Sequence, residues 1–384
     1  GKEGLAYMVS GLIDEGAGEL DSQAFQAKLE NLAIGLSFDV WLESFQGSLR
    51  TLTENRETAF DLLRLALSQP RFDDEPVARI RSQIQVQLAR DSEDPNVIAS
   101  RALRELMFPG HPYSRPVRGT PETIEAITVE DMRRFVAERF ALDALKIAVV
   151  GDVTPEELGA LLDRAFAGLP GEAAPFDLPE VEPQGQGEVL VIERDLPQSV
   201  VLFGHGGMRR QDPEFYAAYV ANHILGGGGF SSRLYDEVRE KRGLAYSVYS
   251  YLQPMEHSAT IQGGVATANA RVGESLAVIR EEWARMGESG PTAEEVDDAK
   301  TFLTGSYPLR FSSTGNIAGM LLGIQLDDLG IDYVNLRNDL IEAVSTEQAQ
   351  RVARELFRPE DLTVVIVGRP DGVAPEKPAA DESG

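Results

Sequence analysis

Hydrophobic positions along the chain repeat every two residues in some segments and every three to four in others, which predicts a mixture of strands and helices. Strands are expected at residues 189–193, 199–205 and 260–267, and helices at 212–224 and 271–286. Thr292 and Glu295 form a capping box that predicts the start of one more helix. Several helices for every few strands predict an α+β sandwich, in which helices cover one face of a largely antiparallel sheet.

Part of this pattern occurs twice. Residues 124–140 align without gaps with 341–357, at an offset of 341 − 124 = 217, and residues 145–151 fall on 362–368 at the same offset. Each copy therefore predicts a helix followed by a buried strand that ends in glycine, and the two copies predict two tandem homologous domains. Both helices are expected to begin with a capping box, formed by Thr128 with Asp131 and by Ser345 with Gln348.

A proline-rich and glycine-rich stretch separates the copies. Residues 169–187 contain four prolines and three glycines, which exclude a helix or a central strand. The tail has too few apolar residues to pack and is expected to be disordered. The predicted order is a first α+β domain at 1–170, a linker at 171–187, a second α+β domain at 188–370 and a disordered tail at 371–384.

Composition excludes several classes of function. The chain has 384 residues and a formal charge of 36 − 62 = −26, which repels nucleic acid and anionic membrane surfaces. No run approaches the length of a membrane-spanning helix. The chain has no cysteine, and its four histidines lack helical ligand spacing, so we expect structural or surface roles for them and no metal site: His111, His205, His223 and His257.

The most distinctive segment is a run of four glycines, residues 226–229, followed by a short helix and a strand. Either Ser231 or Ser232 is placed to cap the helix start with its hydroxyl group. Gly243 is placed to end the helix in the left-handed conformation.

The strand after this helix predicts where its side chains point. A period of two places Tyr246 on the same face as Val248, and it places Ala245 and Ser247 on the other. Arg239, near the end of the helix, and Tyr246 then flank one helix-to-strand corner and can reach a common point.

This segment resembles the second half of the pitrilysin and insulinase-type zinc metallopeptidases, including the processing-peptidase branch. In that family an arginine and a tyrosine seven residues later face the zinc site, and the matching pair here is Arg239 and Tyr246. The resemblance implies that they hold the substrate carbonyl and the oxyanion that forms on water attack. It also implies that the glycine-rich loop engages substrate, with a plain turn as the alternative. The loop residues concerned are Gly227, Gly228, Gly229 and Phe230.

The same resemblance leads us to expect an H-x-x-E-H zinc motif in the first half, on a helix after a Gly-Leu-Ala run. The run is present at residues 4–6, but the two ligand positions and the general-base position are all replaced. They carry Tyr7, Gly11 and Ser10, respectively. The family takes its third ligand from a glutamate some seventy or more residues downstream, and there is no glutamate between Glu75 and Glu93. The chain is therefore expected to bind no cofactor.

Two function classes follow from the resemblance. In the first, the chain is the zinc-free subunit of a heteromeric metalloendopeptidase that processes or degrades peptides. Its partner is a homologous subunit that carries H-x-x-E-H and the zinc, and this chain forms one half of a clamshell. In the second, the chain is a proteolytically inactive scaffold, as are the core subunits of respiratory complexes that resemble this family. Retention of Arg239 and Tyr246 favours the first class.

The resemblance also bears on the ends and the compartment of the chain. The family places a strand or two before the helix at residues 4–11, so the first domain is expected to be truncated at its N-terminus. Many bacterial relatives are exported, which favours the periplasm slightly over the cytosol. The absence of cysteine is compatible with both compartments.

Overall fold

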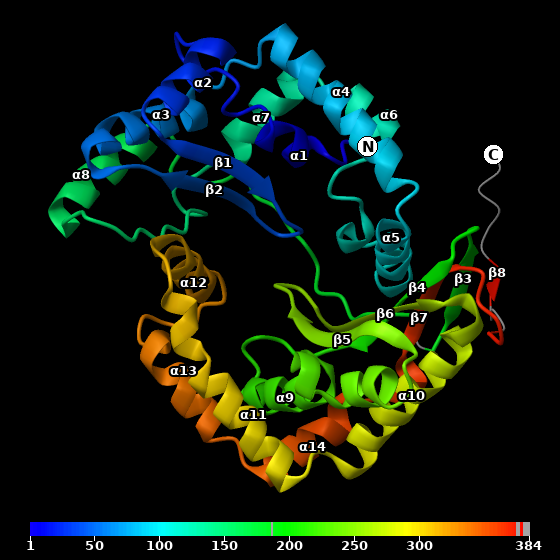
Figure 1. Cartoon of the computed structure of the whole chain (residues 1–384). Coiled ribbons are helices and arrows are strands. Elements are labelled where there is room, and N and C mark those ends of the chain that lie inside the picture. Colours follow the sequence, from blue (N-terminus) through cyan, green and yellow to red (C-terminus); the bar gives the residue numbers. More distant parts are fainter. Residues whose placement is uncertain (186, 374–376, 379–384) are drawn as a thin grey trace. The chain divides into compact units, whose positions relative to one another are not determined.

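The computed structural model describes residues 1–185, 187–373, 377 and 378, and the chain divides into two compact units (Figure 1). Unit 1 contains residues 1–92 and 115–177, and unit 2 contains residues 93–114 and 178 onward. Each unit has a hydrophobic core of its own. The break after Asp177 falls within the predicted linker. Residues 93–114, in contrast, belong to unit 2, although they fall within the range 1–170 expected for the first domain.

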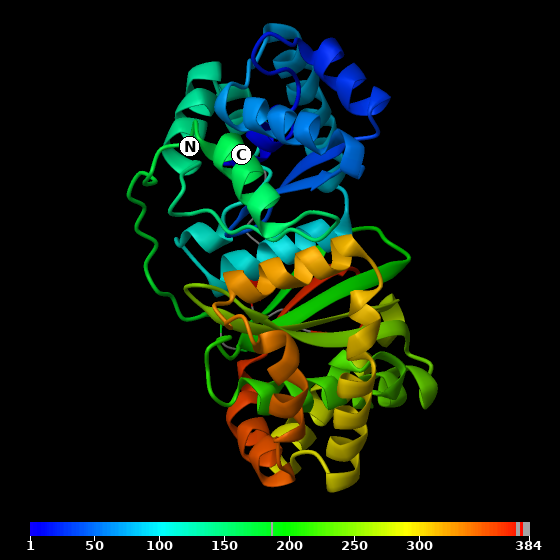
Figure 2. The same cartoon turned by 90° about the vertical axis from the view of Figure 1, so that its left-hand side faces the viewer.

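Unit 1 is mostly helical and surrounds one small sheet. Its strands β1 (Gly35–Val40) and β2 (Phe45–Arg50) are antiparallel. Figure 2 shows the helices of this unit, in blue to green, gathered around the two blue strands. The helices are α1 (Leu5–Ser10), α2 (Ser22–Asn31), α3 (Arg56–Ser68), α4 (Asp74–Asp91), α6 (Pro121–Ala126), α7 (Val129–Arg139) and α8 (Pro155–Phe166), with a short 3-10 segment η1 (Thr53–Asn55).

Unit 2 is built on a larger sheet with the strand order β5-β6-β4-β7-β3-β8. Neighbouring strands are antiparallel except where β3 pairs with β7 and with β8. The strands are β3 (Val189–Glu193), β4 (Gln198–Gly206), β5 (Ala245–Pro254), β6 (Ala259–Ala268), β7 (Thr363–Gly368) and β8 (Lys377–Pro378). The predicted α+β class and the mainly antiparallel pairing are therefore confirmed.

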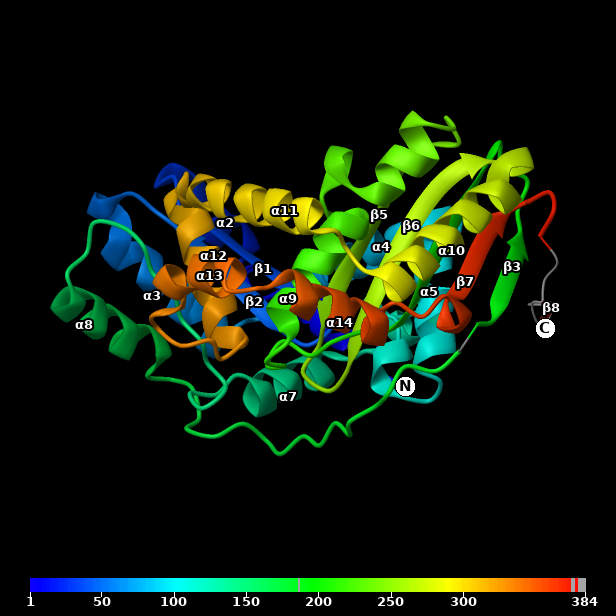
Figure 3. The same cartoon turned by 90° about the horizontal axis from the view of Figure 1, so that it is seen from below.

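Helices cover both faces of this sheet. Helix α5 packs on β4 and β7, and it lies across the sheet from α9, α10 and α14 (Figure 1); Figure 3 views the unit from the side of these three helices. The helices are α5 (Pro95–Met107), α9 (Phe215–Asn222), α10 (Val272–Ser289), α11 (Ala293–Gly305), α12 (Thr314–Leu326), α13 (Tyr333–Glu342) and α14 (Thr346–Leu356). The short segments are η2 (Pro112–Ser114), η3 (His223–Gly227), η4 (Gly229–Ser231), η5 (Tyr235–Glu240), η6 (Asn269–Arg271), η7 (Tyr307–Phe311) and η8 (Pro359–Asp361). Among the described residues, no helix has the length and apolar character needed to span a bilayer.

The duplicated segments begin alike and end differently. Both predicted capping boxes are present, at the starts of α7 and α14, where Thr128 and Ser345 accept from the backbone N–H three residues on. The second copy then forms β7, which is buried along its whole length between β4 and β3. The prediction of a matching buried strand at 145–151 is wrong. That segment belongs to neither sheet and is partly exposed, because no strand of unit 1 is placed alongside it among the described residues.

The predicted disordered tail contains one short strand. Lys377 and Pro378 form β8 and pair in parallel with Leu190 and Val191 of β3. The parts of the tail at 374–376 and 379–384 lie outside the described residues.

Candidate functional site

The arginine and the tyrosine singled out from the sequence lie together in unit 2. The guanidinium carbon of Arg239 is 4.6 Å from the centroid of the Tyr246 ring, 4.7 Å from that of Tyr235 and 5.8 Å from that of Phe230. A guanidinium within about 6 Å of an aromatic ring is attracted by the negative face of the ring. Sequence reasoning missed Tyr235. Its spacing of four residues before Arg239 was the available signal, because residues four apart share a helix face.

A β-bulge sets the direction of the Tyr246 side chain. Ala245 pairs with Thr267 and Val248 pairs with Val265, so two residues of β5, Tyr246 and Ser247, lie opposite one residue of β6. The expectation that Tyr246 shares a face with Val248 is wrong for this reason. Val248 is buried, whereas Tyr246 is 81% exposed and points away from the core. Bulges often redirect a side chain next to a functional site.

The helical segment that carries Arg239 is wider than an α-helix. In η5 (Tyr235–Glu240) the N–H of Lys241 donates to the carbonyl oxygen of Asp236, five residues back, at 2.9 Å. Gly243 has a φ of +60° and its N–H donates to the carbonyl oxygen of Arg239, so it ends the helix in the left-handed conformation as predicted. Helical turns of this π type are rare and are frequent at functional sites.

The glycine run before this helix combines a packed part with an exposed part. A Cβ atom on Gly226 would lie 2.4 Å from the Oγ atom of Ser250, so β5 approaches this backbone closely. Gly229 has a φ of +58° and open space around it, and Phe230 after it is 80% exposed. The run therefore anchors the loop against β5 at one end and presents Phe230 to solvent at the other.

The two serines after the glycine run do not cap the helix, contrary to expectation. The Ser231 hydroxyl donates to the carbonyl oxygen of Gly228 at 3.1 Å, and that of Ser232 donates to the carbonyl oxygen of Gly229 at 2.8 Å. Their hydroxyl groups stabilise the turn of the glycine loop instead of the helix start.

Arg239 differs from a neighbouring arginine in how its charge is paired. Arg233 forms two hydrogen bonds of 2.6 Å with the carboxylate of Glu295. The nearest carboxylate oxygen to Arg239 is that of Glu240 at 3.8 Å, and among the described residues its guanidinium group forms no hydrogen bond. Its N–H groups are therefore available to an added ligand.

In unit 1, the three positions of the replaced zinc motif are used for packing. The buried Ser10 hydroxyl donates to the carbonyl oxygen of Tyr7 at 2.9 Å. The Tyr7 ring lies 5.6 Å from the guanidinium carbon of Arg118, and a Cβ atom on Gly11 would lie 3.3 Å from Cγ2 of Ile80. Within the described part of the chain, no group of histidine, aspartate and glutamate side chains is arranged to hold a metal ion.

The histidines make contacts of a structural kind. His205 is buried, and its Nε2 atom accepts from the Trp283 indole N–H at 2.9 Å. Its Nδ1 atom lies 2.7 Å from the carbonyl oxygen of Gly206, and burial lowers the pKa of His205 to about 4. The others contact different groups: His111 the carbonyl oxygen of Pro179, His223 the ring of Phe302, and His257 the carboxylate of Glu180.

Comparison with known proteins assigns a family. An uncharacterized zinc protease of Streptomyces coelicolor is 30% identical to this chain over 331 residues, which cover 82% of this chain and 70% of that protein. The peptidase M16 inactive domain matches residues 126–303. The chain belongs to the peptidase M16 family.

Two further M16 relatives cover nearly the whole chain. A non-peptidase homolog of Helicobacter pylori, YmxG, is 28% identical over 366 residues, or 95% of this chain and 84% of the relative. The crystal structure of a peptidase M16 inactive domain from Pseudomonas fluorescens has a TM-score of 0.90 at 28% identity and covers 98% of this chain and 90% of that one. The resemblance to the pitrilysin and insulinase type is thereby confirmed.

These relatives agree with the geometry of the M16 chain described above. The match to an inactive domain fits a non-catalytic member of the family. The structure brings Arg239 and Tyr246 together with Phe230 at an exposed corner of unit 2. In unit 1 it buries Ser10 and leaves Tyr7 and Gly11 half-buried.

Proposed function

We propose that this chain is the zinc-free subunit of a heteromeric metalloendopeptidase and contributes Arg239 and Tyr246 to a zinc site on a homologous H-x-x-E-H subunit. One observation carries the proposal. The Tyr246 side chain is 81% exposed, yet it is held next to an arginine whose guanidinium group has no hydrogen-bond partner among the described residues. This exposure places the Tyr246 hydroxyl where a ligand can reach it.

In this proposal the residues of this chain act on the substrate and not on the metal. The partner supplies the zinc-bound water and the general base that takes its proton. When the water attacks the scissile carbonyl, the Tyr246 hydroxyl donates a hydrogen bond to the developing oxyanion. Arg239 fixes the Tyr246 ring by stacking and donates to the substrate carbonyl oxygens, which orients the extended peptide.

The elements around the pair suggest how a peptide is held. Strand β5, which carries Tyr246, is at the edge of the sheet, so its outer side can accept a peptide as an added strand. We assign contacts with the peptide to the loop formed by Gly227, Gly228, Gly229 and Phe230. Its glycines let a peptide backbone approach closely, and Phe230 offers an exposed ring.

The second candidate is a scaffold without any part in proteolysis. It is favoured by the complete replacement of the motif at Tyr7, Ser10 and Gly11 and by the likeness to a protein named as a non-peptidase homolog. A scaffold has no need of an exposed tyrosine beside an arginine that lacks a hydrogen-bond partner among the described residues, and for this reason the first function is preferred.

Cleavage of a quenched fluorescent peptide library separates the two candidates. The library is incubated with this chain, with a homologous H-x-x-E-H subunit, and with the mixture, all in the presence of zinc. We expect activity that rises strongly only in the mixture. Equal activity of the H-x-x-E-H subunit with and without this chain would support the scaffold, and zinc-dependent cleavage by this chain alone would refute both candidates.

A further inference from the structure

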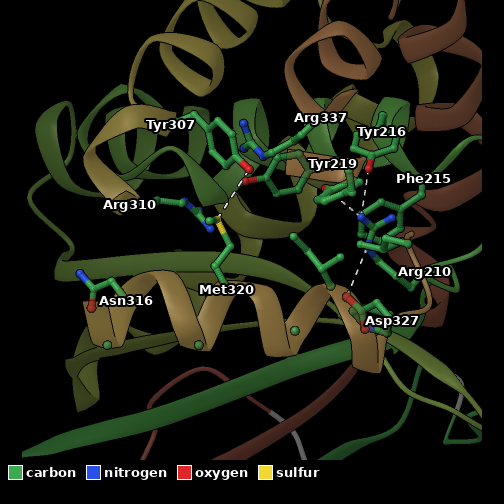
Figure 4. Close-up of a pocket in the computed structure, with 17 residues that line it drawn as sticks. Arg210, Phe215, Tyr216, Tyr219, Tyr307, Arg310, Asn316, Met320, Asp327 and Arg337 are labelled. Atoms are coloured by element: carbon green, nitrogen blue, oxygen red, sulfur yellow. Dashed lines mark hydrogen bonds and ion pairs between the residues drawn. The ribbon is translucent and has the colours of Figure 1, made fainter. Parts of the chain in front are cut away.

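A second candidate site is a pocket of about 700 Å³ in unit 2, away from the residues assigned above (Figure 4). Its walls come from α9, η7, α12 and α13, and it lies within the range of 300–1,000 Å³ that is usual for small-ligand sites. Its polar groups are mainly arginine and tyrosine side chains. The arginines are Arg210, Arg310 and Arg337, and the tyrosines are Tyr216, Tyr219, Tyr307 and Tyr333.

Arg210 is a fixed part of the pocket wall. Its Nη2 atom donates to the hydroxyl oxygens of Tyr216 and Tyr333 at 3.0 and 2.9 Å, and its Nε atom lies 3.6 Å from the Asp327 carboxylate. Its guanidinium carbon is 4.3 Å from the centroid of the Phe215 ring. Arg210 and Asp327 neutralise each other, so this pair adds no net charge to the pocket.

The other two arginines have no acidic partner among the described residues. Arg337 is buried, and it donates to the uncharged oxygens of Leu303 and Asn338 at 3.1 and 3.0 Å. Arg310 is exposed at the pocket and forms no hydrogen bond or ion pair among the described residues. The pocket thus carries two uncompensated positive charges, although the chain as a whole has a formal charge of −26.

Neutral hydroxyl donors lie beside these charges. The Tyr307 hydroxyl lies 3.6 Å from the sulfur of Met320, and the guanidinium carbon of Arg337 is 4.4 Å from the Tyr307 ring centroid. Burial raises the pKa of Tyr307 and of Tyr333, so both remain protonated at neutral pH. Guanidinium and phenol groups can donate hydrogen bonds to an anionic group, and the apolar space between them can hold an apolar part of the same ligand.

Helix α12 leaves space along one wall of the pocket for the apolar part of a ligand. Gly315, Gly319 and Gly323 repeat every four residues along α12 and share one helix face. A Cβ atom on any of them would meet nothing within 4 Å. Space that these glycines leave empty is therefore space that a ligand can occupy, and Met320 and Ile324 add apolar lining.

We infer that this pocket binds a carboxylate on an apolar residue, with Arg310 as the residue that pairs with it. A single free guanidinium fork at the pocket, with Arg337 farther in, suits the two oxygens and single charge of a carboxylate. The source is either the C-terminal residue of a peptide or a free N-acylated amino acid. The inference does not depend on the proposed peptidase partnership, because the pocket belongs to this chain alone.

Isothermal titration calorimetry of the full chain tests it with three probes: alanyl-alanyl-leucine, the same tripeptide as its C-terminal amide, and N-acetyl-leucine. We expect the free-acid tripeptide to bind at least about tenfold more tightly than the amide, since a hydrogen bond to a charged group is worth about 1.5–3 kcal/mol. Tighter binding of the tripeptide than of N-acetyl-leucine identifies the C-terminal residue of a peptide as the source of the carboxylate, and tighter binding of N-acetyl-leucine identifies a free N-acylated amino acid. Arg310→Gln should remove the preference for the free acid, and Arg354→Gln, at another exposed arginine, should keep it.

A second variant tests the location of the site. In Gly319→Leu the added Cβ atom has nothing within 4 Å and the rest of the side chain takes up pocket space, so this variant should abolish binding of all three probes. Gly159→Leu on α8, where a Cβ atom also has nothing within 4 Å, should leave binding unchanged. Near-ultraviolet circular dichroism checks that both variants are folded. Equal affinity for acid and amide, no heat of binding for either free acid, or wild-type binding by Gly319→Leu would each overturn the inference. None of these outcomes affects the test of the proposed function, which needs the partner subunit.

Discussion

Helix α1 of unit 1 and the corner between η5 and β5 of unit 2 both carry the family resemblance, and they treat their polar side chains in opposite ways. At α1, Ser10 is only 6% exposed and its hydroxyl group is hydrogen-bonded inside the helix, and Tyr7 and Gly11 are half-buried. At the corner, a bulge turns Tyr246 out to solvent and a π-type turn brings Arg239 beside it. Under the proposed function this difference marks what each region does: Ser10 serves the packing of unit 1, whereas Arg239 and Tyr246, held toward solvent, act on the substrate.

The largest expected effect concerns Tyr246. Tyr246→Phe removes one hydroxyl and leaves the stacking on Arg239 intact, so assembly and stability should not change. Turnover by the mixture with the H-x-x-E-H subunit should fall by about 10² to 10³, the usual cost of removing one oxyanion donor. Steady-state cleavage of a fluorescent peptide measures it. If the variant assembles stably and turnover is unchanged, the corner between η5 and β5 has no chemical role, and the contrast with α1 is lost.

The second prediction compares how the stabilities of the two units depend on pH. The pKa of His205 in unit 2 is lowered to about 4 by burial, so between roughly pH 6.5 and 4 the unfolded state binds a proton that the folded state does not. Stability of unit 2 should therefore fall by roughly 3 kcal/mol as the pH drops through this window. Burial raises the pKa of Asp14 in unit 1 to about 6, which has the opposite sign: its contribution is present below about pH 4 and is lost as the pH rises to about 6.

The fluorescence of Trp283 reports the unfolding of unit 2, because the indole is buried against His205; a Trp41→Phe background removes the other tryptophan. His205→Gln should reduce the acid dependence seen with this probe, leaving the part due to His223, whose pKa is also lowered by burial, and Asp14→Asn should leave it unchanged. A Trp283 transition with the same pH dependence in wild type and His205→Gln would count against the assignment.

Placing a histidine back at one expected zinc-ligand position tests whether the packing around α1 still leaves room for it. Gly11 has an ordinary φ of −81°, so Gly11→His carries no backbone strain, but its Cβ atom would lie 3.3 Å from Cγ2 of Ile80, which must shift to admit the imidazole. We expect a loss of about 1–3 kcal/mol in the free energy of unfolding, as for other overpacked sites. Urea unfolding followed by circular dichroism measures the loss. Gly159→His on α8, where nothing lies within 4 Å of a Cβ atom, is the matched control; equal costs for the two variants would contradict the prediction.

Arg239 should affect substrate binding more than turnover. Arg239→Ala removes a guanidinium group that has no hydrogen-bond partner among the described residues, so we expect a Michaelis constant about tenfold higher, which corresponds to the loss of one charge-assisted hydrogen bond. Arg242→Ala, three residues further on, removes an ion pair and a backbone hydrogen bond, both with Glu237, and should leave the constant unchanged. If both variants behave alike, Arg239 has no special relation to the substrate.

The smallest effect is expected at the end of the helix. Gly243 has a φ of +60° and open space around it, so Gly243→Ala should cost about 1 kcal/mol through backbone conformation alone. Gly305→Ala on α11, which has equally open space and no positive φ, should not destabilise the chain. Thermal unfolding of the two variants gives the comparison, and a neutral Gly243→Ala would show that the left-handed turn is not required at the corner.

Sequence reasoning succeeded where local chemistry decides the structure. The capping boxes at Thr128, Thr292 and Ser345 need only a hydroxyl and a polar side chain three residues apart, and all three formed. The strands at 189–193 and 260–267 and the meeting of Arg239 with Tyr246 likewise follow from short-range patterns.

It failed where neighbours from elsewhere in the chain decide. Residues 145–151 and 362–368 have matching apolar patterns, but only the second segment has β4 and β3 beside it, so only the second is a strand. The outward turn of Tyr246 depends on an extra residue relative to β6, which strict alternation cannot predict. The arginine pocket joins Arg210 to Arg337 across more than a hundred residues, and no motif connects them.

Helix α5 gives the chain a further property. It is encoded between two stretches of unit 1 but covers β4 and β7 of unit 2, so the backbone passes from one unit to the other three times. During synthesis α5 emerges long before β7. The apolar face of α5 therefore stays uncovered until a strand about 260 residues later in the chain has been made. A gene fragment that begins at the linker would encode the whole sheet and still leave one face uncovered. The two halves of this molecule are therefore poor candidates for exchange by recombination, since neither is a complete folding unit in the linear message.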